Sequence, residues 1–432
     1  MVVSDQWLAA THPGYNSLMR TLIATLIALM LFTPTRVVAG DSDAAQEALS
    51  RPLEWGDAEQ LDFDPAKLAI IDHEIGKLIN DDDLPGAIVA IVRGDKFVYH
   101  KTFGKLKPKS DLAMPTDAVF QIFSMTKPII SVAVMQLVER GHLALNDPLA
   151  SYISAFGGMT VWENDREVPA EGKITIADLL RHTSGLTYGF FGTGYVRSLY
   201  KAREISSRHQ TLQQFVNKIA SIPLEHHPGR VWEYSRSVDV LGRVIEIVSG
   251  KPLQDYLKEN IFMPLGMNET YFTGPWAPMD RVASSGLADW QMRTVDLEVP
   301  FKSGGGGLLS TMADYITFCR MILNGGRLGG REILKRSTVN LMTSNQLGDR
   351  PRGQWDGPGR GYGFGYGFAV RIDELAAYPG SIGDLWWGGY AGTYFWIDPA
   401  KQMIVVIMVQ STKKRRALRP LMRNLVYDAL EK

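Results

Sequence analysis

Apolar positions in the first part of the chain follow two different periods. Between Asp64-Pro65 and residue 80 they recur every three or four residues, which predicts a helix with one buried face and an N-cap at Asp64. Two β-rich runs follow, Gly86–Arg93 and Lys96–Phe103, and the Gly94-Asp95 pair between them predicts a β-hairpin. The buried helix positions are Leu68, Ile71, Ile75 and Leu78.

The pattern then becomes mostly helical and returns to strands near the C-terminus. The run from Pro128 to Arg140 is almost wholly apolar and predicts a buried helix that ends at Gly141. Helical patterns separated by glycine- and proline-containing loops occur at Thr175–Arg181, Leu212–Ile219 and Val238–Val248. The late β-rich runs are Gly365–Ile372, Ile382–Trp387, Gly392–Asp398 and Met403–Gln410, with Asp398-Pro399-Ala400-Lys401 as the last turn.

Strands at both ends of the chain that bracket a helical middle predict an α+β fold. We expect one antiparallel sheet flanked by helices and built from both chain ends. Residues 62–140 and 301–432 then form an α/β domain, and residues 141–300 form a mostly helical domain. The active site is expected between the two domains.

Composition describes an ordinary globular protein. Of the 432 residues 45% are hydrophobic and 21% are charged, with a formal net charge of zero, so nothing favours a nucleic-acid partner. The basic cluster Lys413–Arg416, continued by Arg419 and Arg423, predicts the solvated face of a C-terminal helix. The single cysteine, Cys319, excludes an internal disulfide and predicts a buried helical thiol. No H-E-x-x-H motif occurs, and we expect no metal and no cofactor.

The N-terminus carries the pattern of a targeting signal. Met19-Arg20 precedes an apolar run from Leu22 to Phe32, and Val37-Val38-Ala39 offers small residues for cleavage after Ala39. Residues 1–39 are therefore expected to be a signal peptide, with Met19 as an alternative start, and residues 40–61 a mobile leader. This favours a periplasmic or secreted protein without stable membrane insertion after cleavage, the alternative being a retained anchor. The oligomeric state is left open.

Candidate chemistry begins at Ser124-Met125-Thr126-Lys127. The serine and lysine are three residues apart at the start of a helix, which places both side chains on one face. An amine at that distance can take the proton of the hydroxyl, and the free N–H groups of a helix start favour negative charge. The alternative is a capping serine followed by a surface lysine.

Two further stretches offer the other parts of an acyl-transfer site. Tyr234, in a loop before the helix near Val238, is a candidate proton-transfer group, provided that a positive charge such as Lys127 lowers its pKa. The stretch Trp387-Gly388-Gly389-Tyr390 ends a strand, and the backbone N–H of Tyr390 can pair with that of Ser124 as an oxyanion hole. The alternatives are a packed aromatic ring and a strand-end turn.

This ordered set of S-x-x-K, Y-S-x and W-G-G resembles the serine β-lactamase and penicillin-binding-protein superfamily, specifically its class C-like branch and the family VIII carboxylesterases. The resemblance covers about residues 65–430 and implies a β-lactamase/transpeptidase-like fold. It implies Ser124 as nucleophile, Lys127 as the group that lowers its pKa, and Tyr234 as general base. Accessory stretches that match are Leu179–Leu186, Pro264–Met267 and Gly305–Thr311.

Departures from the class C pattern indicate the substrate. Class C enzymes carry K-T-G where this chain has Trp387-Gly388-Gly389, so the lysine that docks a substrate carboxylate is replaced by an indole. They carry asparagine where this chain has Arg236, which replaces the missing charge only if it faces the cleft. The resemblance therefore implies a serine esterase that cleaves neutral, short- to medium-chain carboxylic esters through an acyl-enzyme, with apolar contact to Trp387 and weak cephalosporin hydrolysis as a side activity.

Other functions stay open on the same residues. They are a β-lactamase or D-alanyl-D-alanine carboxypeptidase, an acyltransferase, and a non-catalytic binder of peptidoglycan or of a partner protein. An α/β-hydrolase is excluded, because no serine lies in G-x-S-x-G. The stretch Tyr188–Tyr200 predicts a lid over the cleft, Gly361–Gly367 predicts either a cleft wall or a strand-entry turn, and Gly304–Gly307 predicts a tight turn rather than a phosphate loop.

Overall fold

The computed structural model describes residues 53–274, 277–285, 295, 299–355 and 357–430. The described residues all belong to one compact unit. The predicted signal peptide and residues 40–52 of the predicted leader lie outside the described residues. The division into an α/β domain and a helical domain stays a prediction.

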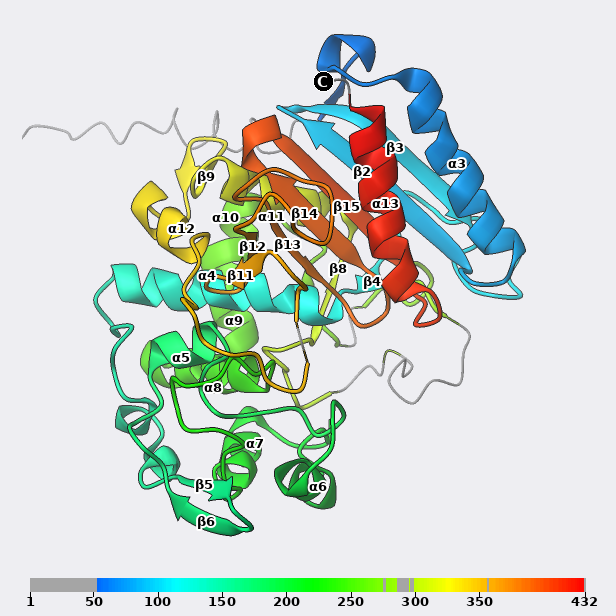
Figure 1. Cartoon of the computed structure of the whole chain (residues 1–432). Helices are drawn as coiled ribbons and strands as arrows, with labels where there is room; N and C mark the ends of the chain where they lie inside the picture. The colour runs from blue at the N-terminus through cyan, green and yellow to red at the C-terminus, as the bar shows by residue number, and fades with distance from the viewer. Residues whose placement is uncertain (1–52, 275–276, 286–294, 296–298, 356, 431–432) are drawn as a thin grey trace, which may run out of the picture. The chain divides into compact units, whose positions relative to one another are not determined.

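An eight-stranded sheet organises the molecule (Figure 1). Its strand order is β1-β3-β2-β15-β14-β13-β12-β11, so strands from both chain ends meet where β2 pairs with β15, as the sequence predicts. All neighbouring strands are antiparallel except β1, which runs parallel to β3. The strands are β1 Glu54–Trp55, β2 Gly86–Arg93, β3 Lys96–Gly104, β11 Tyr362–Phe364, β12 Ala369–Arg371, β13 Leu385–Gly388, β14 Tyr394–Asp398 and β15 Met403–Val409.

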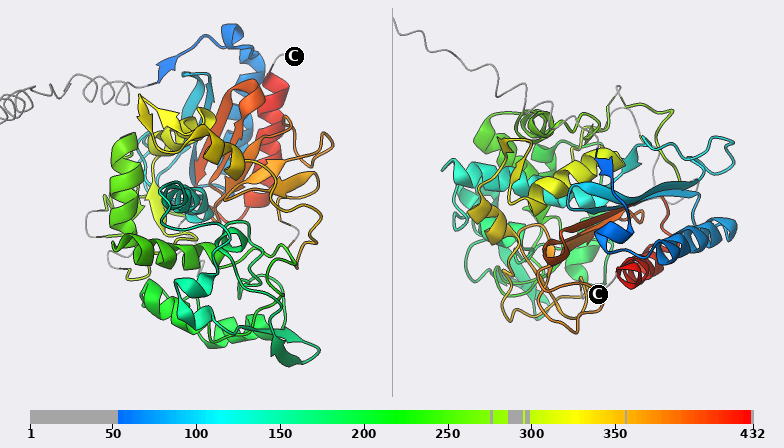
Figure 2. Two further views of the ribbon diagram at one scale, coloured as in Figure 1. Left: turned by 90° about the vertical axis from the view of Figure 1, so that its left-hand side faces the viewer. Right: turned by 90° about the horizontal axis from the view of Figure 1, so that it is seen from above.

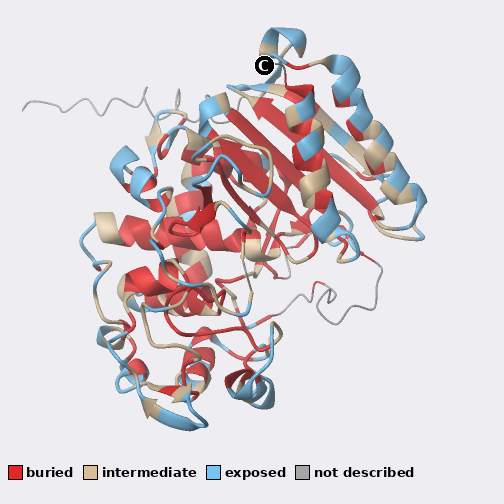
Figure 3. Cartoon of the chain, viewed as in Figure 1, coloured by how far each residue is buried: buried red, intermediate tan, exposed pale blue. Residues whose placement is uncertain are grey.

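Helices cover both faces of this sheet. Helices α3 (Pro65–Asn80) and α13 (Arg415–Ala429) lie side by side on one face (Figures 1 and 2). Helix α11 (Met312–Leu323) packs against β15 on the other face, and it carries Cys319 as the buried thiol that the sequence predicts. Because both faces are covered, β2 and β15 are buried along almost their whole length, which explains their continuous Val/Ile/Ala runs (Figure 3).

The helical region lies beside one edge of the sheet and joins it through α4 (Thr126–Glu139), which packs on α8 (Ser237–Ser249). A three-stranded sheet, ordered β4-β8-β7, runs next to the start of α4. The remaining helices are α5 Ile176–Leu180, α6 Tyr195–Ala202, α7 Leu212–Ile219, α9 Leu253–Leu257, α10 Met263–Leu265 and α12 Arg336–Met342. The short strands are β4 Phe120–Gln121, β5 Thr160–Glu163, β6 Arg166–Pro169, β7 Tyr271–Phe272, β8 Leu308–Ser310, β9 Arg327–Leu328 and β10 Arg331–Glu332.

Three predicted features differ in the structure. The strand expected at Gly365–Ile372 is the turn and second strand of the β11–β12 hairpin, because Gly367 has a φ of +95° that an extended strand does not allow. The predicted leader is ordered from Leu53 onward, since β1 extends the sheet beside β3. The predicted basic cluster is solvated only in part. Lys413, Lys414 and Arg416 are exposed, whereas Arg423 is fully buried and donates to both carboxylate oxygens of Asp384, at 3.1 Å each.

Candidate active site

Ser124 lies in a single 3-10 turn, Phe123–Met125, that leads directly into α4. Phe123 before it has a φ of +44°, a strained conformation for a residue with a side chain. Lys127 follows one turn later, and its Nζ lies 3.1 Å from Ser124 Oγ. The structure therefore brings the predicted serine and lysine together, and the burial of α4 holds both in place.

The environment of Lys127 favours the neutral amine. Its side chain is 1% exposed, and burial lowers its pKa from 10.5 to about 7, with Asp239 raising the pKa and Arg236 lowering it. The Nζ donates to the carbonyl oxygen of Gly305 at 2.6 Å and lies 4.6 Å from the centre of the Tyr234 ring. A large fraction of Lys127 is thus unprotonated near neutral pH and can accept a proton from Ser124.

The glycine run Gly304–Gly307 holds the carbonyl that Lys127 uses. A Cβ on Gly304 would lie 2.5 Å from the carbonyl oxygen of Val238, and one on Gly305 would lie 2.7 Å from Asp239 Oδ2. The buried Asp239 accepts a hydrogen bond from Gly305 N at 3.0 Å. Close packing on α8 therefore requires these glycines, as expected for a tight turn. Sequence reasoning missed Asp239, whose partner Gly305 lies 66 residues away along the chain.

Tyr234 completes the group around Ser124. Its hydroxyl donates to Ser124 Oγ at 2.7 Å, so serine, lysine and tyrosine meet at one oxygen. Burial raises the pKa of Tyr234, and this outweighs the lowering by its hydrogen bonds with Ser124 and Trp387. The phenol is consequently protonated near neutral pH, and the role of Tyr234 as general base stays a prediction.

Trp387 lines the cleft and also makes a contact that the sequence does not predict. Its indole Nε1 donates to Tyr234 Oη at 3.3 Å, and its side chain is 2% exposed. Its ring also packs on Tyr234 and Phe364, with centroid distances of 5.3 Å and 5.1 Å. The indole therefore orients the tyrosine as well as lining the cleft.

The end of β13 reaches the backbone beside Ser124. A Cβ on Gly389 would lie 2.7 Å from the carbonyl oxygen of Ile122, so only glycine allows this approach. The ring of Tyr390 lies 5.9 Å from that of Phe123, and both Ser124 and Tyr390 line the same cleft. This placement is what an oxyanion hole formed by their N–H groups requires, and that role stays a prediction.

Arg236 lines the cleft, but its charge is already paired. Its Nη1 lies 3.3 Å from Asp239 Oδ2, its Nη2 donates to Ser206 Oγ at 2.6 Å, and its guanidinium lies 4.8 Å from the Tyr188 ring centre. A guanidinium held in this way is not available as the main partner of a substrate anion. The structure thus does not support Arg236 as the replacement for the missing lysine.

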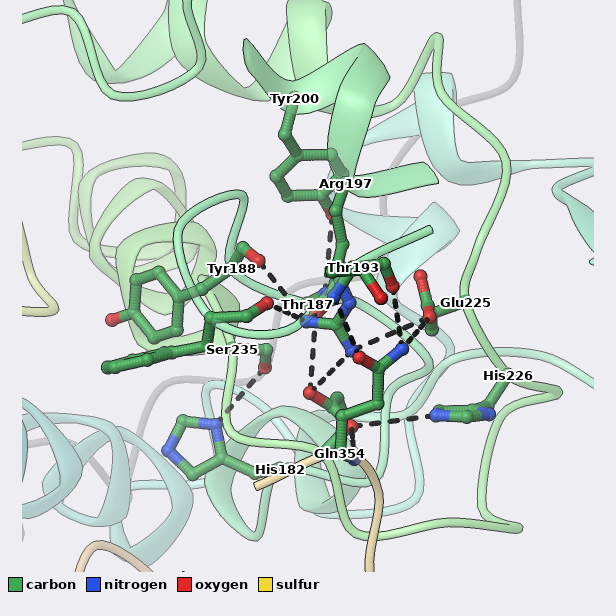
Figure 4. A network of polar contacts seen from close by, with 12 residues as sticks. His182, Thr187, Tyr188, Thr193, Arg197, Tyr200, Glu225, His226, Ser235 and Gln354 are labelled. Atoms are coloured by element: carbon green, nitrogen blue, oxygen red, sulfur yellow. Dashed lines mark hydrogen bonds and ion pairs between the residues drawn. The ribbon is translucent and has the colours of Figure 1, made fainter. Parts of the chain in front are cut away.

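A buried polar network supports the loop that carries Tyr234 (Figure 4). Arg197 on α6 pairs with Glu233 at 2.9 Å and with Glu225 at 3.4 Å, and His226 lies 3.6 Å from Glu233. Arg197 also donates to the carbonyl oxygens of Tyr188 and Phe191. The network therefore ties the residue before Tyr234 to the predicted lid segment.

The stretch Leu179–Leu186, one of the accessory stretches that match the family pattern, supports Tyr234 from another side. His182 accepts a backbone hydrogen bond from Glu233 N at 2.9 Å, and its ring lies 4.9 Å from that of Tyr234. Burial, together with the charge of Lys127, holds the pKa of His182 well below 6.5. His182 is accordingly a neutral packing and hydrogen-bonding residue near neutral pH.

Replacing Arg197 tests this network. Arg197→Met should lower the free energy of unfolding by about 3–5 kcal/mol, because it leaves the carboxylates of Glu233 and Glu225 without their buried cation. The matched control is Arg203→Met on the exposed side, which removes only a hydrogen bond to Ser221. Urea unfolding of both variants gives the comparison, and equal losses in the two would contradict a structural role for the network.

The cleft over Ser124 has a volume of about 290 Å³ and largely aromatic walls. Tyr188, Phe190 and Phe191 line it, which agrees with the predicted contribution of Tyr188–Tyr200. Trp355, which sequence reasoning missed, also lines the cleft. Its ring centroid lies 4.8 Å from that of Tyr234 and 5.8 Å from that of Phe191. The stretch Gly361–Gly367 does not line the cleft in the described structure, and forms the β11–β12 hairpin behind Trp387.

Among the described residues, no group of three or more His, Cys, Asp or Glu side chains is placed to hold a metal ion. No helix in the described ranges is both long and apolar enough to cross a membrane.

The meeting of Ser124, the buried Lys127 and Tyr234 at the start of α4 defines a candidate serine hydrolase site of the β-lactamase type. A family model described as beta-lactamase matches residues 71–427, and the chain belongs to this family. An uncharacterized protein of Mycobacterium tuberculosis is 32% identical over 347 residues, which are 76% of this chain and 86% of that protein. Esterase EstB of Burkholderia gladioli is 29% identical over 381 residues, covering 82% of this chain and 93% of the esterase.

The fold has solved counterparts as well. The structure titled EstCE1, a hydrolase with promiscuous acyltransferase activity, superimposes with a TM-score of 0.69 at 24% identity, covering 84% of this chain and 99% of that one. The likeness confirms the predicted β-lactamase-like fold with its sheet flanked by helices.

Proposed function

We propose that the protein is a serine esterase that cleaves short- to medium-chain carboxylic esters through an acyl-enzyme intermediate. The observation that carries the proposal is the hydrogen bond from Trp387 to Tyr234, which puts an indole where the resembling lactamases have a carboxylate-docking lysine. The aromatic cleft favours acyl and alcohol groups over strongly hydrated ones. Its likeness to Esterase EstB supports the same activity.

Acylation uses the three groups at Ser124 Oγ. Lys127 takes the hydroxyl proton while Ser124 Oγ bonds to the ester carbonyl carbon, and the N–H groups of Ser124 and Tyr390 bind the oxyanion. The tetrahedral intermediate collapses by breaking the bond between the carbonyl carbon and the alcohol oxygen. Tyr234 gives its proton to the departing alkoxide, and the Lys127 ammonium then returns a proton to the phenolate.

Deacylation repeats these steps with water in place of the alcohol. Water attacks the acyl carbon, its proton passes to the Lys127 and Tyr234 pair, and Ser124 Oγ leaves with a proton. An alcohol that occupies the same position would receive the acyl group, so acyl transfer is the side reaction of this site. The proposal also includes a cleaved signal peptide at residues 1–39 and a periplasmic or secreted location.

Side-by-side kinetics test this function. Purified protein should hydrolyse p-nitrophenyl butyrate with a much higher kcat/KM than nitrocefin or a peptide ending in D-alanyl-D-alanine, with the Ser124→Ala protein as the blank. Dominant turnover of nitrocefin or of the peptide would replace the esterase by a β-lactamase or a carboxypeptidase. Absence of all three activities would favour a non-catalytic binder.

Tyr234→Phe separates the phenol's proton transfer from its packing. The variant should lower kcat by about 100- to 1,000-fold, because the leaving alkoxide loses its proton donor while the ring contacts remain. The loss should shrink along a series of aryl esters with increasingly acidic leaving groups, which need no proton. A loss that is equal for p-nitrophenyl and alkyl esters would contradict the role of Tyr234 in protonating the alcohol.

A further inference from the structure

A buried ion pair lies behind the proposed base. Arg236 immediately precedes α8, Asp239 lies in the first turn of that helix, and Arg236 Nη1 is 3.3 Å from Asp239 Oδ2. The side chain of Asp239 is fully buried, and that of Arg236 is 11% exposed. Removing two charges from water is costly, and a hydrophobic pair would fill the same space at a lower cost. The acylation steps proposed above use neither charge, so the pair calls for an explanation.

Asp239 reaches Lys127 through a single residue. Its Oδ1 accepts a hydrogen bond from Gly305 N at 3.0 Å, and the carbonyl oxygen of the same glycine accepts one from Lys127 Nζ at 2.6 Å. The carboxylate and the amine are thus bound to the two ends of one glycine. A side chain at Gly305 would collide with Asp239 Oδ2, since its Cβ would lie 2.7 Å away. The glycine therefore keeps the carboxylate within one residue of the amine.

The other polar side chains that face Lys127 are uncharged near neutral pH. They belong to Ser124, His182, Tyr188 and Tyr234. Burial raises the pKa of both phenols above the ordinary value of 10, and burial together with Lys127 holds the pKa of the imidazole well below 6.5. The charged groups that act on the amine are Asp239, which favours the ammonium, and Arg236, which disfavours it.

We propose that the Arg236–Asp239 ion pair regulates the proposed base. Asp239 stabilises the ammonium that Lys127 becomes when it takes the proton of Ser124, and Arg236 limits this stabilisation so that the resting amine stays neutral. Both act through Lys127 and are therefore positioning residues rather than catalytic ones. The inference rests on the proposed esterase function, in which Lys127 accepts and returns a proton in each turnover.

The two charges work only together. A lone carboxylate beside the amine would keep Lys127 as an ammonium, which cannot accept the serine proton. A lone guanidinium would oppose the positive charge that forms on Lys127 during acylation. Asp239 has the larger effect of the two, so the pair as a whole eases proton uptake. The hydrogen bond of Arg236 to Ser206 and its contact with the Tyr188 ring hold the guanidinium in place.

The pH profiles of two variants test the proposal. Asp239→Asn keeps an acceptor for Gly305 N and removes the charge, whereas Arg236→Met leaves the carboxylate unopposed. The quantity measured is the midpoint of the rise in kcat/KM for p-nitrophenyl butyrate, expected near the Lys127 pKa of about 7 in wild type. The midpoint should move to lower pH in Asp239→Asn and to higher pH in Arg236→Met, by about one pH unit in each. Below its midpoint, Arg236→Met should therefore lose about tenfold in kcat/KM relative to its plateau at high pH.

Further variants separate charge from folding. Arg236→Lys restores a cation and should keep the wild-type midpoint. The double variant, Asp239→Asn with Arg236→Met, leaves no unpaired carboxylate, and its midpoint should lie between those of the single variants.

The same helix offers a matched control pair. Arg243 and Glu246 are also three residues apart on α8, at 2.9 Å, and neither is among the described residues that line the cleft. Arg243→Met and Glu246→Gln should both leave the midpoint unchanged. A displaced midpoint in these controls would show that any change of charge on α8 has this effect, and would overturn a specific role for Arg236 and Asp239.

A merely structural pair predicts a different result. Its loss would lower the plateau of kcat/KM in both single variants at an unchanged midpoint. That result, or a displacement in the same direction in both variants, would overturn the proposal. Absence of ester turnover in wild type would instead overturn the esterase function.

Direct titration of Lys127 keeps these two failures apart. Heteronuclear NMR of the lysine Cε–Hε signals follows its protonation without turnover, and the signal missing from Lys127→Met identifies it. The titration midpoint should move in opposite directions in Asp239→Asn and Arg236→Met, whether or not the protein cleaves esters. Where Arg236→Met does not fold, Asp239→Asn and the double variant give the same test. A Lys127 midpoint that equals the wild-type value in Asp239→Asn would overturn the proposal.

Discussion

Ser124→Ala should abolish ester turnover, with kcat reduced by about 100,000-fold or more. The serine oxygen is the atom on which Lys127 and Tyr234 converge, at 3.1 Å and 2.7 Å, so no other hydroxyl can take its place in that geometry. The fold should survive, because the change removes one oxygen from the short turn before α4 and adds no bulk. Steady-state kinetics measures the loss of turnover, and mass spectrometry shows whether an acyl-enzyme forms with p-nitrophenyl butyrate.

The chain offers a matched control for this variant on the same helix. Ser131 is also buried on α4, and its Oγ has no hydrogen-bond partner. Ser131→Ala should retain the wild-type kcat and the acyl-enzyme mass shift, while Ser124→Ala shows neither turnover nor the mass shift. An acyl adduct on the Ser124→Ala protein would show that another residue is the nucleophile.

The long periodic elements of the fold could be predicted from sequence, and the compact glycine-rich ones could not. The strands β2 and β15 and the helix α7 lie where their patterns place them, because apolar period and turn residues agree there. The strand predicted at Gly365–Ile372 wrongly includes the turn of the β11–β12 hairpin, since glycines alternate with aromatic residues there as strand positions do. The turn depends on φ at Gly367, which the pattern of apolar residues does not encode.

Burial of charge was the other feature that sequence could not supply. Arg423 looks like part of a solvated basic cluster, but its partner Asp384 lies just before β13, 39 residues earlier in the chain. Arg419 was assigned to the same solvated face for the same reason. Local charge patterns describe one helix, whereas the burial of these arginines follows from the packing of α13 on the sheet.

For the site, local spacing was enough for Ser124 and Lys127, and the family resemblance located Tyr234 and Trp387. Their protonation could be assigned only from the structure, because burial lowers the pKa of Lys127 and raises the pKa of Tyr234, which favours the amine over the phenol as proton acceptor. Asp239 could not be predicted either, since it acts through the packing of two distant segments. Residue types thus indicated which groups take part, and packing decided their protonation.

Lys127→Met should lower kcat by about 1,000- to 10,000-fold, because it removes the base while filling the same buried space. In wild type, kcat/KM should rise with pH through a pKa of about 7, the value to which burial lowers Lys127, since only the neutral amine accepts the serine proton. That rise should be absent from the residual activity of the variant. His182 does not account for the rise, because its own pKa lies well below 6.5.

A second lysine provides the control for this pH dependence. Burial also lowers the pKa of Lys302, which donates to the carbonyl oxygen of Thr273 and does not line the cleft. Lys302→Met should keep the wild-type pH profile. Loss of the rise near pH 7 in Lys302→Met, or its retention in Lys127→Met, would contradict Lys127 as the base.

The same buried amine should make the wild-type protein less stable than the Lys127→Met variant. Burial lowers the pKa of Lys127 from its ordinary value of 10.5 to about 7 in the folded protein, so between these limits the unfolded chain binds a proton that the folded chain does not. Wild-type stability therefore rises with pH across this window through Lys127. The Tm of Lys127→Met should exceed that of wild type most below pH 7, and the difference should narrow as the pH approaches 10.5. A constant difference in Tm across the window would mean that Lys127 is charged in the folded protein, and hence unable to act as the base.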